Sequence, residues 1–151
     1  MQPEIPPNTG SIARLCAATG SRLHLIEPLG FSLEDRYLKR AGLDYWPHVD
    51  LALHASWPEF LRDEAPPSPF FYSARAKKSY LAPRYDAAQE VHLVFGGETD
   101  GLPADIASAN RSRTYRIPMF NPHVRSLNLA NAVSIVVYEA LRQRGNLLCG
   151  I

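Results

Sequence analysis

A surplus of charge of either sign is missing from this sequence. Its 151 residues carry 16 Lys and Arg against 15 Asp and Glu, which leaves a formal net charge of +1. A strongly basic domain is the usual electrostatic footprint of a protein that binds nucleic acid. Composition alone therefore gives no support for an RNA or DNA partner.

Cysteine is scarce as well. Cys16 and Cys149 stand near opposite ends of the chain, and neither belongs to a C-x-x-C pair. No Cys/His spacing matches a zinc site. We expect two reduced thiols in a cytosolic protein, with Cys16 buried in a helix.

Long apolar runs are also absent. The longest, residues 132–141, contains Ser134 and Glu139 and is too short to cross a bilayer. The first eight residues lack the apolar core of a signal peptide. We therefore expect a cytoplasmic protein without a membrane partner.

What the sequence does contain is an alternation of short apolar runs with helical patterns. This alternation predicts an α/β fold with a largely parallel sheet flanked by helices. At this length a single domain, residues 1–151, is the natural expectation. Helices are expected at residues 8–18, 32–40, 56–65, 103–109 and 128–144, and strands at 23–26, 49–53, 70–73, 91–95 and 114–117. Asn8 or Thr9 and Ser56 are the expected N-caps of the first and third helices, and Gly20 and Gly145 are expected to end the first and last.

Two segments with unusual composition could carry chemistry. Residues 8–14, Asn-Thr-Gly-Ser-Ile-Ala-Arg, place Arg14 in a helix of mainly small or apolar residues. A single helical arginine is, by itself, more often solvated or paired than functional. Residues 95–103, Phe-Gly-Gly-Glu-Thr-Asp-Gly-Leu-Pro, put glycines directly after an expected strand. Such glycines either make a tight turn or let a ligand approach the backbone closely, but they do not form the G-x-G-x-x-G dinucleotide fingerprint.

A third such segment is residues 116–140. A short apolar run followed by Pro118 leads into a polar loop and then into a helix that opens near Ser126 and Asn128. This order places polar groups and free backbone N–H donors of a helix N-terminus beside the end of a buried strand.

Together these segments resemble, in the right order, the three sequence motifs of the SPOUT methyltransferases. The second is similar to the family's Gly-Pro-Glu-x-x-Gly-Leu-Pro, with Gly97 where proline is usual and with Glu98 in its place. Residues 3–10, 23–31 and 41–45 further resemble the TrmL branch, whose members methylate the wobble ribose of certain tRNAs.

The resemblance implies a SPOUT fold whose C-terminal part forms a trefoil knot. True knots are nearly absent from proteins, so this expectation depends on the resemblance alone. Family members enter the first motif from an apolar strand, whereas only Met1 and Gln2 precede Pro3 here. Either the start of the sequence is misplaced, or the expected sheet lacks this first strand from its middle.

The resemblance also implies a site and a reaction, transfer of a methyl group from S-adenosylmethionine to a ribose 2′-hydroxyl, with S-adenosylhomocysteine as the product and no metal. The residues expected to line the cofactor pocket are Tyr72, Gly96, Ile117, Ser126 and Leu127. Arg14 would approach the ribose hydroxyl, and Asn8, Glu98 and Asn128 would position substrate and loop. An arginine stays protonated in proteins, so a general base is not assigned.

The expected function is thus that of a tRNA ribose 2′-O-methyltransferase acting at the anticodon wobble nucleotide. Two alternatives remain open: an rRNA ribose methyltransferase of SpoU type, and a non-catalytic RNA-binding relic of the family. The last helix is apolar on more than one side, which fits a central core helix or the interface of a homodimer. The resemblance favours the homodimer, in which Arg75, Lys77 and Lys78 would join Arg14 of the other subunit in a basic groove for tRNA.

Overall fold

The computed structural model describes residues 1–33 and 45–145, which divide into two compact units. Unit 1 comprises Met1–Ala65, Gly97–Asp100 and Asn128–Ala130, and unit 2 comprises Pro66–Gly96, Gly101–Leu127 and Asn131–Ile151. Within the described residues, no helix is both long enough and apolar enough to cross a membrane.

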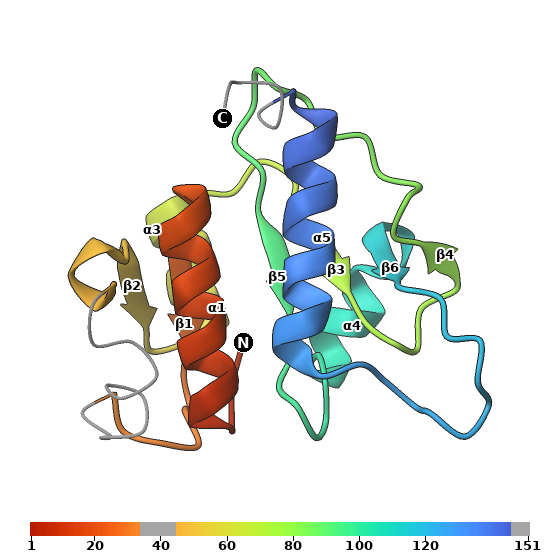
Figure 1. Cartoon of the computed structure of the whole chain (residues 1–151), viewed down its shortest axis with the longest axis horizontal. Helices are drawn as coiled ribbons and strands as arrows, with labels where there is room; N and C mark the ends of the chain where they lie inside the picture. The colour runs from red at the N-terminus through yellow and green to blue at the C-terminus, as the bar shows by residue number, and fades with distance from the viewer. Residues whose placement is uncertain (34–44, 146–151) are drawn as a thin grey trace. The chain divides into compact units, whose positions relative to one another are not determined.

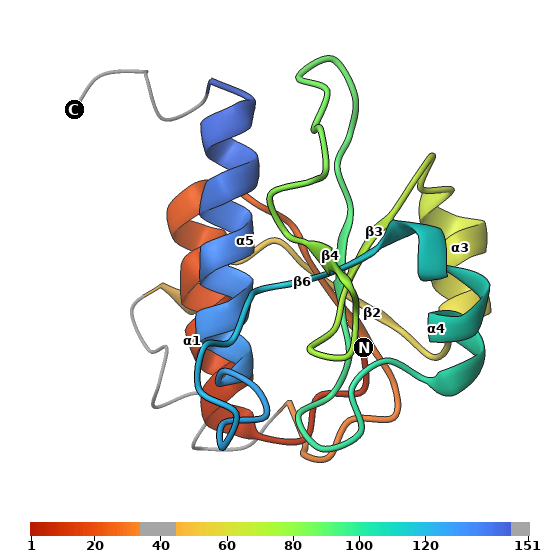
Figure 2. The same cartoon turned by 90° about the vertical axis from the view of Figure 1, so that its right-hand side faces the viewer.

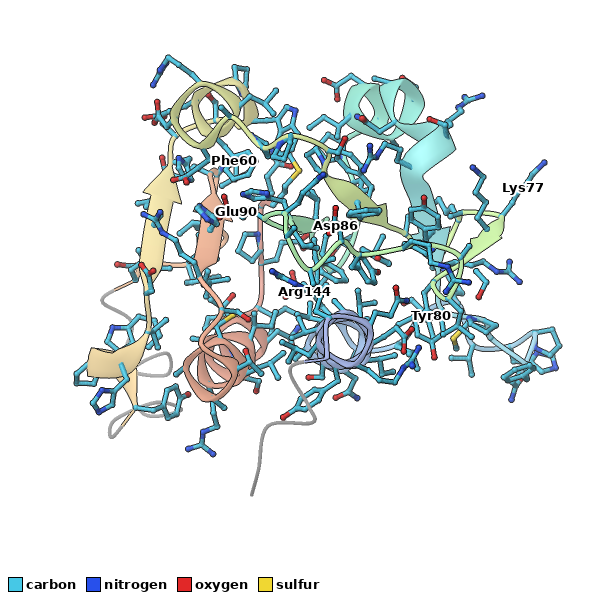
Figure 3. The ribbon with its side chains drawn as sticks, turned by 90° about the horizontal axis from the view of Figure 1, so that it is seen from above. Phe60, Lys77, Tyr80, Asp86, Glu90 and Arg144 are labelled. Carbon is cyan, nitrogen blue, oxygen red and sulfur yellow. The ribbon has the colours of Figure 1, made fainter. Side chains whose placement is uncertain are left out.

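Unit 1 is built around a pair of parallel strands. Its elements are helix α1 (Pro6–Thr19), strand β1 (Leu23–Ile26), the 3-10 helix η1 (Trp46–His48), strand β2 (Leu51–His54) and helix α3 (Trp57–Glu64). β1 and β2 pair in parallel, and α1 and α3 cover opposite faces of the pair (Figure 3). Ala13 and Cys16 of α1 pack against Leu23 and Leu25 of β1.

The start of α1 differs from the expectation. We predicted a cap at Asn8 or Thr9, but the helix begins at Pro6, with Ile5 as an N-cap that makes no side-chain bond. Proline is pre-organised for the first turn of a helix, where its missing N–H costs nothing. Asn8 and Thr9 are consequently buried inside the helix. The predicted end is confirmed, since Gly20 adopts the left-handed conformation with φ of 64°.

Unit 2 is a four-stranded sheet with helices on both faces. Its elements are β3 (Phe70–Tyr72), β4 (Lys78–Ser79), β5 (Leu93–Phe95), α4 (Ala104–Ala109), the 3-10 helix η2 (Arg111–Arg113), β6 (Thr114–Arg116) and α5 (Leu129–Gln143). The strand order is β4-β6-β3-β5, and all three pairings are parallel (Figure 1). The sheet lies between α5 and α4 (Figure 2).

The predicted α/β class with parallel strands is confirmed, with several differences in detail. The sequence did not predict β4, because a two-residue strand of exposed polar residues has no apolar run. The strands also form two sheets, and no strand precedes α1 within residues 1–33. Two backbone hydrogen bonds hold the N-terminal segment instead. The Gln2 N–H donates to Ile26 O at the end of β1, at 2.8 Å, and the Gly30 N–H in the following loop donates to Pro3 O at 2.9 Å. The helix expected at residues 32–40 lies almost entirely outside the described residues.

Candidate active-site residues

Three predicted site residues of unit 1 form one chain of hydrogen bonds. Asn8 Nδ2 donates to Glu98 Oε1 at 2.9 Å, and Asn128 Nδ2 donates to Asn8 Oδ1 at 2.8 Å. Asn128 Oδ1 in turn accepts the Ala130 N–H at 2.9 Å, which caps the start of α5. The bonds join residues 90 and 120 positions apart in the sequence. All three expected motifs thus meet in this cluster, which we call the Asn8 cluster.

Two residues that sequence reasoning missed reinforce the Asn8 cluster. The Glu4 N–H donates to Glu98 Oε2 at 2.8 Å, and the Glu4 carboxylate accepts Thr99 Oγ1 at 2.5 Å and the Thr99 N–H at 3.2 Å. Glu4 and the Glu98–Thr99 pair therefore hold each other reciprocally. Both residues stand inside segments that carried the family resemblance, and that position is the only signal that could have identified them.

Arg14 lies on a different face of α1. It is six residues from Asn8, roughly 240° around an ideal helix. Its side chain is exposed, and its guanidinium carbon lies 4.6 Å from the centre of the Tyr45 ring. Tyr45 is itself held to the helix, because its hydroxyl donates to Gly10 O at 2.9 Å. The cation–π contact supports the long side chain while leaving it exposed to solvent.

Three of the predicted cofactor residues lie together at one edge of the unit 2 sheet. Tyr72 is the last residue of β3, and Gly96 and Ile117 directly follow β5 and β6. β5, β3 and β6 are neighbours and parallel, so their carboxyl ends share an edge. Ligands of open parallel sheets bind at this edge.

The side chain of Tyr72 points into the core of unit 2. The Tyr72 ring stacks on Phe95 with centroids 5.1 Å apart, and its hydroxyl is hydrogen-bonded to that of Tyr85. Burial is the main cause that raises the pKa of both phenols above their ordinary value, so both stay protonated. Any contact of Tyr72 with a ligand would have to come from its backbone.

The structure changes the reason for glycine at position 96. A Cβ atom there would lie 1.9 Å from Gly101 C and 2.1 Å from Gly101 O and Leu102 N. The close approach that requires glycine is therefore made by the chain's own backbone, which closes the loop between β5 and α4. Of the two explanations for glycine here, the contacts support the tight turn, and the assignment of Gly96 to the cofactor site stays a prediction.

Ser126 and Leu127 belong to the loop between β6 and α5. Ser126 is exposed and Leu127 half-buried. Earlier in this loop, the His123 N–H donates to Asn121 Oδ1 at 2.9 Å and the Val124 N–H to Asn121 O at 3.2 Å, which makes a turn. Both residues stay predicted ligands of the cofactor.

With this geometry in place, the chain can be compared with known proteins. Residues 1–138 match the model of the SpoU rRNA methylase family. The chain belongs to this family. It is 49% identical over 145 residues to the tRNA (cytidine(34)-2′-O)-methyltransferase of Escherichia coli K12, covering 95% of this chain and 90% of the relative.

Solved structures of this family give the same result. A structure concerned with the 2-OH methylation of C/U34 on tRNA superposes with a TM-score of 0.85 at 51% identity, over 96% of this chain and 93% of that one. The SpoU methyltransferase AviRb of Streptomyces viridochromogenes, in complex with the cofactor AdoMet, has a TM-score of 0.79 at 26% identity, over 96% and 58%. The predicted SPOUT RNA methyltransferase family is thereby confirmed.

Proposed function

We propose that this chain is an S-adenosylmethionine-dependent tRNA ribose 2′-O-methyltransferase acting at the wobble nucleotide, position 34. The observation that carries the proposal is the Asn8 cluster, in which all three family motifs are joined by hydrogen bonds. Family membership, together with the named activity of a relative about half identical over nearly the whole chain, supports the same substrate.

The residues of unit 2 fit a nucleoside cofactor. The carboxyl edge of β5, β3 and β6 combines the backbone groups of Tyr72, Gly96 and Ile117 with the half-buried side chain of Ile117. Ser126 and Leu127 would complete the set from the next loop. When bound, S-adenosylmethionine supplies an electrophilic methyl group on a sulfonium sulfur. Chemistry of that kind needs no metal.

Arg14 is proposed to act on the ribose. Its exposed guanidinium donates hydrogen bonds in a fixed fork, which suits a 2′-hydroxyl and a neighbouring phosphate. We assign it the orientation of the hydroxyl and the stabilisation of negative charge that develops as the hydroxyl loses its proton. The proton acceptor is left unassigned, because the Arg14 guanidinium stays protonated and the buried phenols of Tyr72 and Tyr85 keep their protons.

Asn8, Glu98 and Asn128 are proposed as positioning residues. Their side-chain bonds to one another connect the N-terminal segment, the loop after β5 and the start of α5. Alignment of reacting groups contributes about 7–11 kcal/mol to well-oriented reactions. Rigid support of these three segments would therefore contribute to the reaction by holding the reacting groups in line.

The proposal includes the assembly of the protein. We propose a single SPOUT domain over residues 1–151, a C-terminal trefoil knot and a two-fold homodimer in the cytoplasm. One stripe of α5 is exposed and carries Asn131, Ile135, Tyr138 and Arg142, spaced as one face of a helix. Ile135 and Tyr138 are 37% and 47% exposed, which supports an interface there.

Phosphate contacts with tRNA are proposed for unit 2. Arg75, Lys77 and Lys78 are all exposed, and Lys77 projects away from the sheet (Figure 3). Because such contacts release counterions, tRNA affinity should fall steeply as salt rises.

Incorporation of a tritiated methyl group from S-adenosylmethionine tests the function directly. The purified protein is incubated with unmethylated bulk tRNA and, separately, with rRNA, and the products are digested to nucleosides. We expect label in tRNA only, as a 2′-O-methylated nucleoside at position 34. Label in rRNA alone would favour the SpoU-type alternative, label on a base would refute the reaction type, and no label in either RNA would favour the relic.

A further inference from the structure

Two histidines and a glutamate of unit 1 bring their donor atoms together away from the Asn8 cluster. His24 Nδ1 lies 3.0 Å from His54 Nε2. Glu64 Oε1 lies 3.7 Å from the first of these nitrogens and 3.9 Å from the second. Each residue thus offers one potential metal ligand to a common point.

The local fold explains why these three residues meet. In the parallel pair, His24 is opposite Ala52 and His54 is opposite Ile26, so the two histidines are diagonal neighbours on one face. Helix α3 covers that face and ends at Glu64. Phe60 of α3 packs edge-on against both imidazoles, with centroids 5.2 Å and 5.3 Å away, and fixes the orientation of the rings. Figure 3 shows Phe60 between α3 and the strands.

We propose that His24, His54 and Glu64 bind a divalent transition-metal ion of the zinc class. Zinc accepts imidazole nitrogen and carboxylate oxygen, and ligands in a tetrahedral site are about 3.3 Å apart at ordinary bond lengths. The three observed separations of 3.0, 3.7 and 3.9 Å bracket this value. Two ring nitrogens this close share either a proton or a metal, and the nearby carboxylate favours the metal.

The surroundings of the three ligands support this choice. Asp63 Oδ2 lies 3.9 Å from His54 Nδ1, the ring nitrogen that faces away from the proposed ion. A carboxylate in that position orients a metal-binding histidine and raises its basicity. Arg22 Nη1 contacts Glu64 through Oε2 at 3.4 Å, which leaves Oε1 directed at the histidines.

The site provides three protein ligands and limited access to solvent. The His54 side chain is 5% exposed, whereas those of His24 and Glu64 are 14% and 18% exposed. We assign the fourth position of a tetrahedral ion to a water molecule. The ion would link the last residue of α3 to β1 and β2, and thus stabilise unit 1. This role is independent of methyl transfer, which requires no metal.

Zinc titration of the full chain, followed by competition with a chromophoric chelator, tests the proposal. We expect one tight site per chain and a rise in the melting temperature of roughly 5–10 °C at a hundredfold excess over Kd. Glu64→Gln keeps the shape of the ligand and removes its charge. It should weaken binding by more than the roughly 10–100-fold expected for Asp63→Asn, which removes only the outer carboxylate.

Two histidine variants complete the design. His54→Ala should abolish the tight site, whereas His48→Ala should leave it unchanged, because His48 is exposed on η1 of the same unit. If His54→Ala fails to fold, Glu64→Gln and X-ray absorption of the wild-type zinc complex decide. A zinc X-ray absorption spectrum that shows only nitrogen and oxygen ligands, two of them imidazoles, supports the proposal. Sulfur ligation, or equal zinc affinity in wild type and Glu64→Gln, would reduce the cluster to a hydrogen-bonded histidine pair.

Discussion

Unit 1 and unit 2 hold their candidate site residues by opposite means. In unit 1 the side chains of Asn8, Glu98 and Asn128 bond to one another, and nearly all their partners are distant in sequence. In unit 2 three of the candidate positions lie at strand ends, and the tyrosine among them, Tyr72, is turned into the core. Substitutions in unit 1 should therefore act through lost hydrogen bonds, and those in unit 2 through volume.

The largest effect is expected at Arg14, a candidate residue of unit 1 that lies outside the Asn8 cluster. Its side chain is exposed, and its guanidinium lies against the Tyr45 ring. Arg14→Ala should lower turnover by roughly 10²–10³, by analogy with the loss of one transition-state donor. Cofactor affinity, measured by calorimetry, and melting temperature should stay near wild type.

Arg62→Ala is the matched control for that experiment, because Arg62 is also an exposed arginine on a helix of unit 1. It should leave turnover unchanged. Full activity in Arg14→Ala would show that the assigned role is wrong, whereas an equal loss in both variants would indicate a general effect of surface charge on RNA binding.

Volume in unit 2 is tested at Gly96. Gly96→Ala places a Cβ about 2 Å from the backbone of Gly101 and Leu102, which cannot move aside as a side chain could. We expect a loss of at least about 2 kcal/mol in the free energy of unfolding, measured with denaturant, since overpacking typically costs 1–3 kcal/mol.

Gly101→Ala tests the effect of backbone conformation separately from the steric effect of an added Cβ. Gly101 has φ of 75°, but a Cβ there meets nothing within 4 Å. Its replacement should cost only the left-handed strain, about 1–2 kcal/mol. If Gly101→Ala were the more damaging of the two, loop conformation and not close packing would be the requirement at this turn.

Lost hydrogen bonds in unit 1 are tested at Asn8, which is 7% exposed. Asn8→Ala removes two part-buried hydrogen bonds, the one to Glu98 Oε1 and the one from Asn128 Nδ2. A hydrogen bond contributes about 0.5–1.5 kcal/mol net, and about 1.5–3 kcal/mol where one partner is charged, so we expect a clear loss in the free energy of unfolding. Asn110→Ala removes a bond that spans only four residues, from Asn110 Nδ2 to Ile106 O. It should be milder in the same denaturant titration, and equal costs would contradict the long-range role of Asn8.

The smallest effect is expected at Glu139 of α5, whose partner Arg142 is exposed. Glu139 accepts two bonds from Arg142 and one from Gln143, and these bonds lower the pKa of its carboxyl from 4.5 to about 2. A carboxyl with a lowered folded-state pKa stabilises the fold above pH 4.5, and this contribution is lost as pH falls toward 2.

Glu139→Gln should accordingly lower the melting temperature by roughly 2 °C at most near pH 6. The difference from wild type should shrink as pH falls below 4.5, which melting curves across this range would show. A difference that persisted at pH 2.5 would mean that packing, and not charge, is what Glu139 contributes.

Local patterns predicted most elements of both units. The strand at Leu23–Ile26 is confirmed to the residue, as is the Ser56 cap, whose Oγ accepts the Glu59 N–H at 3.3 Å. Gly145, with φ of 76°, follows α5 as its spacing predicted. These features depend on neighbours within one or two turns, which a sequence displays directly. Strand β4 was not predicted, because only its pairing with β6 makes these two residues a strand.

The sequence also determined which residues are candidates. The three motifs identified the family, and with it Asn8, Arg14, Glu98 and Asn128. This was possible because residue types and their spacing can be read from the sequence without the structure. Burial of Cys16 followed from its place in an apolar helix, and desolvation raises the pKa of its thiol to about 11.

Only the tertiary structure decided how these residues act. It joined Asn8 to partners 90 and 120 residues away and added Glu4 and Thr99 to the same network. It also showed that a side chain at position 96 would collide with the backbone of Gly101 and Leu102. It also brought His24 and His54 onto one face of two paired strands, under Glu64. Contacts of this kind depend on register and on the crossing of distant segments, and neither leaves a local pattern in the sequence.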